Sequence, residues 1–239
     1  MDDMTFQRAR SADQRAQRRA AIIETAAEML EEMPVAEISL NELARRVGLA
    51  KSNVLRYVES REEVLLVLLA DEFARWIDGI DGEVSGLIDP AAPVGERCEQ
   101  LASALAASLL ARPRMCELSS ASAAVLERNI SVDAAVQFKV AAGAQIERVV
   151  ETVRTHLPEL TVADAGMFVQ TAALMADALW VHSRPPPAVE AAYAARPDLA
   201  SLRVDVERAL PETMAVVLAG LLARGRASRG NDDGESRKS

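Results

Sequence analysis

The chain has 239 residues, half of them apolar and only 3% aromatic, and its formal net charge is -9. This length allows a small domain joined to a larger one, and abundant alanine and leucine favour helices over sheets. Cys98 and Cys116 lack metal-type spacing, so we interpret them as buried reduced thiols and expect neither a metal nor a cofactor. We find no signal peptide and no apolar run of membrane-spanning length, which predicts a cytoplasmic protein without a membrane partner.

The N-terminal region begins with polar residues and then becomes helical. Residues 1–17 are polar and are predicted to form a flexible arm. From residue 18 apolar side chains recur at three- and four-residue steps, which predicts a helix that Pro34 ends. The positions expected to be buried on this helix are Ile22, Ala26, Met29 and Met33.

Residues 39–61, "SLNELARRVGLAKSNVLRYVESR", predict two short helices joined by a tight turn. Ser39 is a natural N-cap, with Glu42 at the capping-box position three residues later. Gly48 ends the first helix because glycine readily adopts a positive φ, and Lys51 begins the second. Val54 and Val58 lie four residues apart and are expected to face inward. The pattern is typical of a helix-turn-helix.

The outward side chains of this segment suit a nucleic acid. Hydroxyls, amides and cations can contact base edges and phosphates in a major groove. Residues 1–61 hold ten basic and ten acidic residues, so the net charge of -9 lies in the rest of the chain, which would repel DNA. Taken alone, the pattern also fits an exposed helical hairpin with solvated arginines. The predicted DNA-binding residues are Ser39, Arg45, Arg46, Lys51, Ser52, Asn53, Arg56, Tyr57 and Arg61.

Residues 18–75, including "RAAIIETAAEMLEEMPVAEISLNELARRVGLAKSNVLRYVESREEVLLVLL", resemble the N-terminal domain of the TetR family of bacterial transcriptional regulators. The resemblance implies an all-α homodimer whose C-terminal domain binds a small molecule and thereby changes the separation of two DNA-reading domains; most such proteins are repressors. Leu55 stands where the family often has a tyrosine, Val58 where many members have phenylalanine, and Arg61 where lysine is common. Tyr57 is expected to supply the hydroxyl that Leu55 lacks.

The remaining sequence predicts further helices separated by breakers. Ser60 should cap a fourth helix, followed by a Gly/Pro-rich loop at 81–93. Further helices are expected at about 94–111, 114–128, 131–156 and 161–181. Residues 183–199 are predicted to be irregular, and a last helix at 203–223 should be kinked or divided by Pro211. We therefore predict an all-α chain with a flexible arm at 1–17, a three-helix DNA-binding domain at 18–62, a larger helical effector-binding and dimerisation domain at 63–223, and a disordered tail at 224–239.

The last two long helices carry small and apolar faces that permit close helix approach. Such faces serve equally well inside one subunit or between two, and the family resemblance favours a homodimer. The residues concerned are Ala172, Ala173, Ala176 and Leu179 on one helix, and Val216, Val217, Ala219, Gly220 and Leu221 on the other.

A binding site for a small effector is predicted in the C-terminal region. Several sulfur-containing and aromatic residues could line an apolar cavity, although the same residue types also form ordinary cores. The candidates are Met115, Cys116, Phe138, Met167, Phe168, Met175 and Trp180, with Asn129 and His182 to orient a ligand. No catalytic motif is present, so we do not expect an enzyme. The predicted partners are a near-palindromic double-stranded operator, a second copy of the chain and an unidentified effector. The alternative is a helical interaction scaffold, or a small-molecule-binding module, that does not bind DNA.

Overall fold

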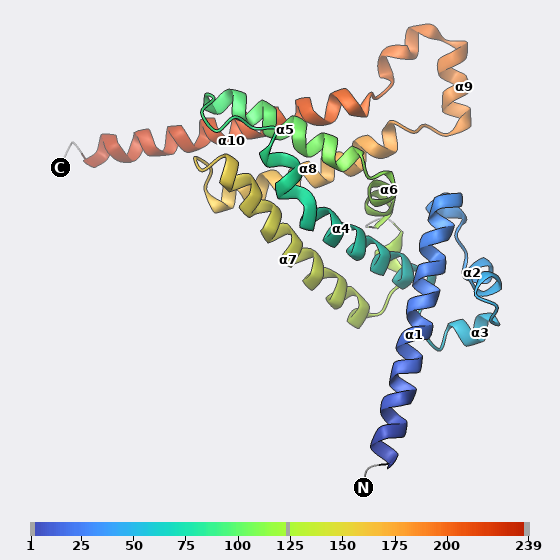
Figure 1. Ribbon diagram of the computed structural model, residues 1–239. Helices are drawn as coiled ribbons and strands as arrows, with labels where there is room; N and C mark the ends of the chain where they lie inside the picture. The colour runs from blue at the N-terminus through green and yellow to red at the C-terminus, as the bar shows by residue number, and fades with distance from the viewer. Residues whose placement is uncertain (1–2, 123–124, 237–239) are drawn as a thin grey trace. The chain divides into compact units, whose positions relative to one another are not determined.

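In the computed structural model, which describes residues 3–122 and 125–236, every regular element of these ranges is a helix (Figure 1). The all-α prediction is therefore confirmed. The α-helices are α1 Asp3–Glu32, α2 Leu40–Arg46, α3 Lys51–Val54, α4 Arg61–Ser85, α5 Val94–Leu110, α6 Pro113–Ser122, α7 Val132–His156, α8 Val162–His182, α9 Pro187–Ala195 and α10 Val206–Ser236. Three short 3-10 turns are η1 Val35–Glu37, η2 Leu126–Arg128 and η3 Pro197–Leu202.

The helices form two compact units. The first combines the chain up to Glu72 with Ala121–Ala141, and the second combines Phe73–Ser120 with the chain from Ala142 onward. Helices α4 and α7 each contribute residues to both units. The sequence placed a boundary near residue 62, at the start of α4, whereas the compact units divide this helix after Glu72.

The core of the first unit follows the predicted stripe of α1. Ile22, Ala26 and Met29 are at most 1% exposed, and Leu65 and Leu69 of α4 are buried to the same degree. These positions recur every three or four residues, so each helix presents one continuous apolar face. Removal of this apolar surface from water stabilises the unit that holds α2 and α3.

In the second unit, α5 packs against α10, and α10 packs against α8. Figure 1 shows α5 running alongside the middle of α10. The buried face of α5 includes Leu101, Ala102 and Ala106, and that of α10 includes Leu210 and Leu218. Alanine lets two helix backbones approach closely, while leucine fills the remaining space, so a compact core forms with few aromatic residues.

Hydrogen bonds fix α5 to its other neighbours in this unit. The Ser108 hydroxyl accepts from Trp76 Nε1 at 2.8 Å and donates to the Glu83 carboxylate at 2.6 Å, which ties α5 to α4. Arg97 donates to the His156 carbonyl at 2.5 Å and forms an ion pair with Glu159, which ties α5 to the end of α7. Because Ser108 and Trp76 are buried, the hydrogen bond between their side chains is stronger than a solvent-exposed hydrogen bond.

The structure corrects the expectation of an irregular segment at 183–199. Residues 187–195 form α9, and η3 follows at 197–202. Pro186 is the N-cap and Pro187 the first helical residue, where proline is favoured because its fixed φ suits the first turn. The prolines were interpreted as breakers, whereas here they begin a helix that alanine then continues.

Both chain ends also differ from expectation, and Pro211 does not divide the last helix. Helix α1 begins at Asp3 and α10 continues to Ser236, so helix covers most of the predicted arm and tail. Their alanines and arginines have high helix propensity, and a helix anchored at one end extends readily. Helix α10 passes through Pro211 without being divided, because Leu210 and Met214 bury side chains on both sides of it.

Three other predicted boundaries shift. Helix α4 extends to Ser85, so the connection to α5 starts at residue 86 rather than 81. Helix α6 ends at Ser122, before the predicted residue 128, and η2 follows at Leu126–Arg128. The helices expected from residues 131 and 161 are capped by Ser131 and Thr161: each hydroxyl accepts from a backbone N–H three residues later, at 3.1 and 3.0 Å.

Helix α8 corrects the expectation that no apolar run reaches membrane-spanning length. Its 21 residues have a mean hydropathy of 1.2 over the most apolar window, and it alone among the described helices is long and apolar enough to cross a membrane. One such helix is weak evidence for a span, because core and interface helices share this composition.

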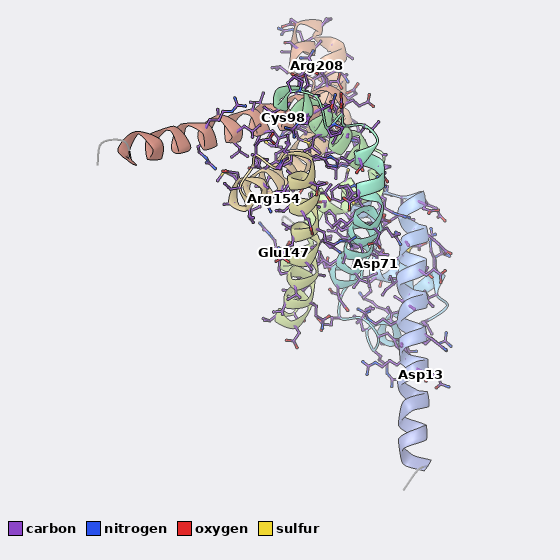
Figure 2. The ribbon with its side chains drawn as sticks, turned by 60° about the vertical axis from the view of Figure 1, so that its left-hand side comes forward. Asp13, Asp71, Cys98, Glu147, Arg154 and Arg208 are labelled. Atoms are coloured by element: carbon purple, nitrogen blue, oxygen red, sulfur yellow. The ribbon has the colours of Figure 1, made fainter. Side chains whose placement is uncertain are left out.

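The two thiols yield a test of the packing. Burial raises the pKa of Cys98 to about 11 and that of Cys116 to about 12, and both side chains are less than 9% exposed. Cys98, which is labelled in Figure 2, belongs to α5. Thiolate is the reactive form, so we expect alkylation of the folded protein at pH 8 to be about 100-fold slower or more than after denaturation. Mass spectrometry after iodoacetamide treatment measures both rates. Rapid modification of the folded chain would contradict the buried placement.

Candidate nucleic-acid interface and ligand cavity

The two short helices of the first unit are joined as the sequence predicts. The Ser39 hydroxyl accepts from the Glu42 N–H at 3.2 Å and caps α2. Gly48 has a φ of +68°, and it is the only residue with a positive φ among those described. The next N–H, that of Leu49, donates to the Ala44 carbonyl at 3.0 Å. This closes the end of α2 and turns the chain into α3.

Helix α3 presents polar side chains outward over a buried valine pair. Val54 and Val58 are 0% and 3% exposed, which confirms that they face inward. Lys51, Ser52 and Asn53 are exposed. The α-helix is shorter than expected, because residues 55–57 continue as a tighter turn with bonds from the N–H groups of residues 56 and 57 to carbonyls three residues earlier. Arg56 is exposed on this turn, and Tyr57 is half-buried.

The arginines of α2 are held by acidic side chains. The Glu42 carboxylate accepts from Arg45 at 2.6 and 2.8 Å and from Arg46 at 3.1 Å. Arg46 also pairs with Glu32 of α1 at 2.7 Å. Hydrogen bonds from both guanidinium groups lower the pKa of Glu42 to about 2. Arg45 keeps 71% of its side chain exposed against 21% for Arg46, so Arg45 is the more accessible cation.

Arg61 faces partly inward, which corrects the expectation that its side chain points away from the core. Its guanidinium donates to the Val35 carbonyl and pairs with Glu62 at 3.5 Å, and only 20% of the side chain is exposed. Its buried Nε has no hydrogen-bond partner among the described residues. The side chain therefore links η1 to the start of α4. Sequence spacing could not reveal this, because the carbonyl it binds lies 26 residues away.

The structure adds α1 residues that the sequence analysis missed. Gln14, Arg15 and Arg18 line a polar hollow together with Arg56 and Tyr57 of the helix-turn-helix. Arg15 donates to the Arg56 carbonyl at 3.0 Å, so the two cationic groups lie on one surface. The basic run "RAQRR" at residues 15–19 was the available signal, but residues 15–17 had been assigned to a flexible arm, and Arg18 and Arg19 had been interpreted only as the start of a helix.

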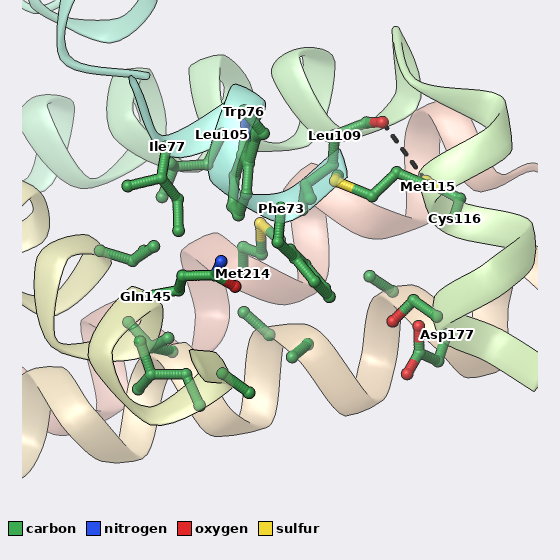
Figure 3. A pocket seen from close by; sticks show the side chains of 18 of the residues that line it. Phe73, Trp76, Ile77, Leu105, Leu109, Met115, Cys116, Gln145, Asp177 and Met214 are labelled. Atoms are coloured by element: carbon green, nitrogen blue, oxygen red, sulfur yellow. Dashed lines mark hydrogen bonds between the residues drawn. The ribbon is translucent and has the colours of Figure 1, made fainter. Parts of the chain in front are cut away.

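The second unit contains an apolar cavity of about 160 Å³ (Figure 3). Helices α4, α5, α6, α7, α8 and α10 all contribute to it. Its polar lining groups are Ser119, Gln145 and Asp177. The apolar and thiol side chains around it are Phe73, Trp76, Ile77, Leu105, Leu109, Met115, Cys116, Ala142, Ile146, Val149, Phe168, Val169, Ala172, Ala173, Ala176 and Met214.

Three of the nine predicted effector residues line this cavity, namely Met115, Cys116 and Phe168. The Cys116 thiol donates to the Leu109 carbonyl at 3.3 Å, as Figure 3 shows. Phe73, Trp76 and the α5 leucines were missed because they belong to helices that the sequence analysis interpreted only as core.

The other six predicted effector residues lie elsewhere. Asn129 and Phe138 belong to the first unit, and Phe138 lines a separate small pocket there. Met167 and His182 are exposed, Met175 is half-buried, and Trp180 is buried with the Arg184 guanidinium 3.2 Å from its ring centroid. Residue type could not separate the α8 positions, because inclusion in the cavity depends on which side of α8 a residue occupies, and Asn129 and Phe138 belong to the other unit.

Comparison with known proteins decides the family. The family model described as "Tetracyclin repressor-like, C-terminal domain" matches residues 70–225. The chain belongs to the TetR family of transcriptional regulators.

Two kinds of relative agree with this assignment. The HTH-type transcriptional regulators Rv1816 of Mycobacterium tuberculosis and Mb1846 of Mycobacterium bovis are each 39% identical over 69 residues, which are 29% of this chain and 30% of theirs. A "possible TetR family transcriptional regulator" from Streptomyces coelicolor A3(2) superposes with a TM-score of 0.54 at 18% identity, over 86% of this chain and 98% of that one. The fatty acid degradation regulator FadR of Bacillus halodurans gives 0.50 at 15% identity, over 85% and 96%. At these identities the solved structures show the fold alone.

Two departures from the usual TetR-family sequence can now be located. Leu55 is 44% exposed at the end of α3, beside the polar surface rather than in the core. Val58 is 3% exposed and occupies the core position as expected. The smaller side chain therefore still closes the underside of the helix-turn-helix.

Gly48 provides a test of the turn in this TetR-family chain. A Cβ at a φ of +68° is strained, so Gly48→Ala should lower the free energy of unfolding by about 1–2 kcal/mol. Gly82→Ala is the matched control, because Gly82 lies within α4 and a Cβ there would meet nothing within 4 Å. This control should raise stability by up to about 1 kcal/mol. Urea denaturation of both variants measures the difference, and equal effects would contradict the turn geometry.

Proposed function

We propose that this TetR-family protein binds double-stranded DNA in a sequence-specific manner and regulates transcription, most simply as a repressor. The observation that carries the proposal is the surface of α3. Lys51, Ser52 and Asn53 are exposed together on one helical turn, and Arg56 follows on the next turn. A scaffold or a purely small-molecule-binding module would not need these groups above a buried valine pair.

The exposed groups divide by reach and charge. Ser52 and Asn53 are short and lie near the start of α3, where bases approach most closely, so we assign them to base edges. Lys51 and Arg56 are assigned mainly to phosphates, and Arg15 of α1 extends this cationic surface. Arg45 is a further phosphate contact, whereas Arg46 and Arg61 hold the domain together through Glu32 and the Val35 carbonyl.

The proposed assembly is a homodimer formed by α8 and α10. Met167, Leu174 and Val181 recur at seven-residue spacing on α8 and are 46%, 71% and 54% exposed. Val216 of α10 is 71% exposed. Helices with apolar residues at this spacing bury them against another helix, and two copies would supply it. Leu221, also predicted in this face, is only 6% exposed and belongs to the core of its own unit.

A dimer of this kind would read a near-palindromic operator. Two copies of α3 would occupy successive major grooves about 34–36 Å apart. A small molecule in the cavity of the second unit would lower DNA affinity if it bound more tightly to a conformation of the dimer that cannot reach both half-sites of the operator. The protein would act in the cytoplasm, and the proposal assigns it no catalytic step.

Substitutions in α3 test DNA binding after an operator has been selected from random duplexes. Lys51→Ala should weaken binding to operator and to random DNA alike and reduce the salt slope by about one. Asn53→Ala should cost about 1–3 kcal/mol on the operator and relax preference at one position per half-site. Fluorescence anisotropy at several salt concentrations measures both effects. Arg196→Ala, which removes an exposed cation between α9 and η3, is the control. If both α3 variants bind the operator with the affinity of the parent protein, the surface of α3 is not the DNA-binding surface.

The dimer is tested with a charge on the exposed α8 face. Leu174→Glu should produce a monomer because it would bury two carboxylates between subunits. Leu87→Glu is the matched control, since Leu87 is 61% exposed and lies in the connection after α4. Light scattering at micromolar concentration gives the mass. A Leu174→Glu variant that remains dimeric would place the interface elsewhere.

A further inference from the structure

The cavity of the second unit has an uneven charge distribution. Asp177 is the only carboxylate among its described lining residues, and no arginine, lysine or histidine is among them. Figure 3 shows Asp177 at the end that holds Met115 and Cys116, whereas Gln145 lies on the other side of Phe73. The site is therefore an apolar chamber with one acidic end.

Among the described residues that line the cavity, none supplies a counter-ion to the acidic end. The interaction recorded for Asp177 is a hydrogen bond from the Ser119 hydroxyl. Burial raises the pKa of Asp177, and this hydroxyl opposes the rise. A carboxylate that is taken out of water without a cation is unfavourable, and either a proton or a cation relieves it.

Two arginines that influence the neighbouring Cys116 thiol, Arg184 and Arg112, have other partners. The Arg184 guanidinium lies over the Trp180 ring and donates to the Ser183 hydroxyl at 3.0 Å. Arg112 forms an ion pair with Glu83 and donates to the Ser108 carbonyl at 2.6 Å. The other titratable group in the lining, the Cys116 thiol, is neutral at physiological pH because burial raises its pKa to about 12. No described residue forms an ion pair with Asp177, so a cationic ligand could fill this role.

We propose that the effector is a hydrophobic amine whose ammonium group pairs with Asp177 while its apolar body fills the space around Phe73 and Met214. This inference rests on the proposed ligand-responsive function and names the ligand class. Fatty acids and other carboxylates are disfavoured, since their charge would face Asp177 with no cation in the lining.

The cavity sets the size of the apolar part. An engineered cavity of about 150 Å³ holds benzene, so a volume of about 160 Å³ suits one ring or a short branched chain. An ammonium group joined to the ring by a short linker would leave the ring among Phe73, Phe168 and Met214. The lining alanines of α8 keep this space open.

The experiment compares matched ligands on the unaltered full-length protein. Benzylamine, 2-phenylethylamine, 4-phenylbutylamine and octylamine are each paired with the alcohol of the same skeleton, and phenylacetate represents the anions. Calorimetry in the absence of DNA should show at least one amine binding about tenfold more tightly than its alcohol, and phenylacetate binding most weakly. If no amine binds more tightly than its alcohol, or if phenylacetate binds best, the inference is wrong.

The Asp177→Asn variant tests whether the preference for amines over alcohols depends on the Asp177 carboxylate. This variant should bind the amine no more tightly than the alcohol, while Asp198→Asn, at an exposed carboxylate in η3, should behave like the parent. Removal of a buried unpaired charge should also leave the melting temperature unchanged or higher. Should Asp177→Asn keep the amine preference, Asp177 is not the site. If the variant does not fold, the amine–alcohol comparison on the parent protein still decides.

A separate readout distinguishes failure of the inference from failure of the proposed function. Operator affinity is measured by anisotropy with and without saturating amine. Amine binding that leaves operator affinity unchanged would sustain the ligand class and refute the ligand response. If calorimetry shows no preference for any amine and no amine changes operator affinity, the proposed ligand class is wrong. The proposal that the protein binds DNA would then still stand.

Discussion

The packing of α5 against α10 is the contact on which the second unit depends. Ala102 and Ala106 let the two helices approach closely, and leucines on both sides exclude water between them. The same helix supplies Ser108 to Trp76 and Arg97 to the end of α7. A single apolar helix is thereby tied to α4, α7 and α10, and the space left between these helices, α6 and α8 forms the cavity. Loss of this contact would remove both the core and the cavity.

The first unit is organised by a different constraint, namely the need to hold a very short helix in place. Helix α3 has four residues and could not persist alone, since helix nucleation is unfavourable. Val54 and Val58 anchor it from below, and the Gly48 turn fixes its direction from α2. Glu42 and Glu32 hold Arg46, whereas Arg45 keeps 71% of its side chain exposed although it pairs with Glu42, so Arg45 remains accessible beside the cations of α3, the following turn and α1.

These two constraints fit a regulator in which DNA and ligand are recognised by opposite physical means. The proposed DNA-facing surface consists of exposed polar groups, whose interactions with phosphates would weaken with salt. The cavity is largely apolar, and its one carboxylate is half-buried, so charge would discriminate among ligands of similar shape. Exposed residues of α8, Met167 and Leu174, lie on the same helix as the cavity residues Phe168 and Asp177. Movement of α8 on ligand binding would therefore be transmitted directly to the proposed dimer interface.

Local chemistry in the sequence determined most of the secondary structure and the helix-turn-helix. Ser39, Ser131 and Thr161 cap helices through bonds that span three residues, and Gly48 permits a conformation that a side chain would strain, so each signal is complete within a short segment. Apolar periodicity likewise placed Val54 and Val58 in the core.

Tertiary structure alone decided the features that join distant segments. Arg61 binds a carbonyl 26 residues away, and α10 continues through Pro211 because burial on both sides outweighs a lost hydrogen bond. The cavity gathers side chains from six helices, and Asp177 carries no mark in the sequence that separates it from a surface acid. Whether a methionine, an aromatic ring or a carboxylate lines a cavity depends on how its helix is rotated against its neighbours. That rotation is set by the packing of the whole core and not by any local residue pattern.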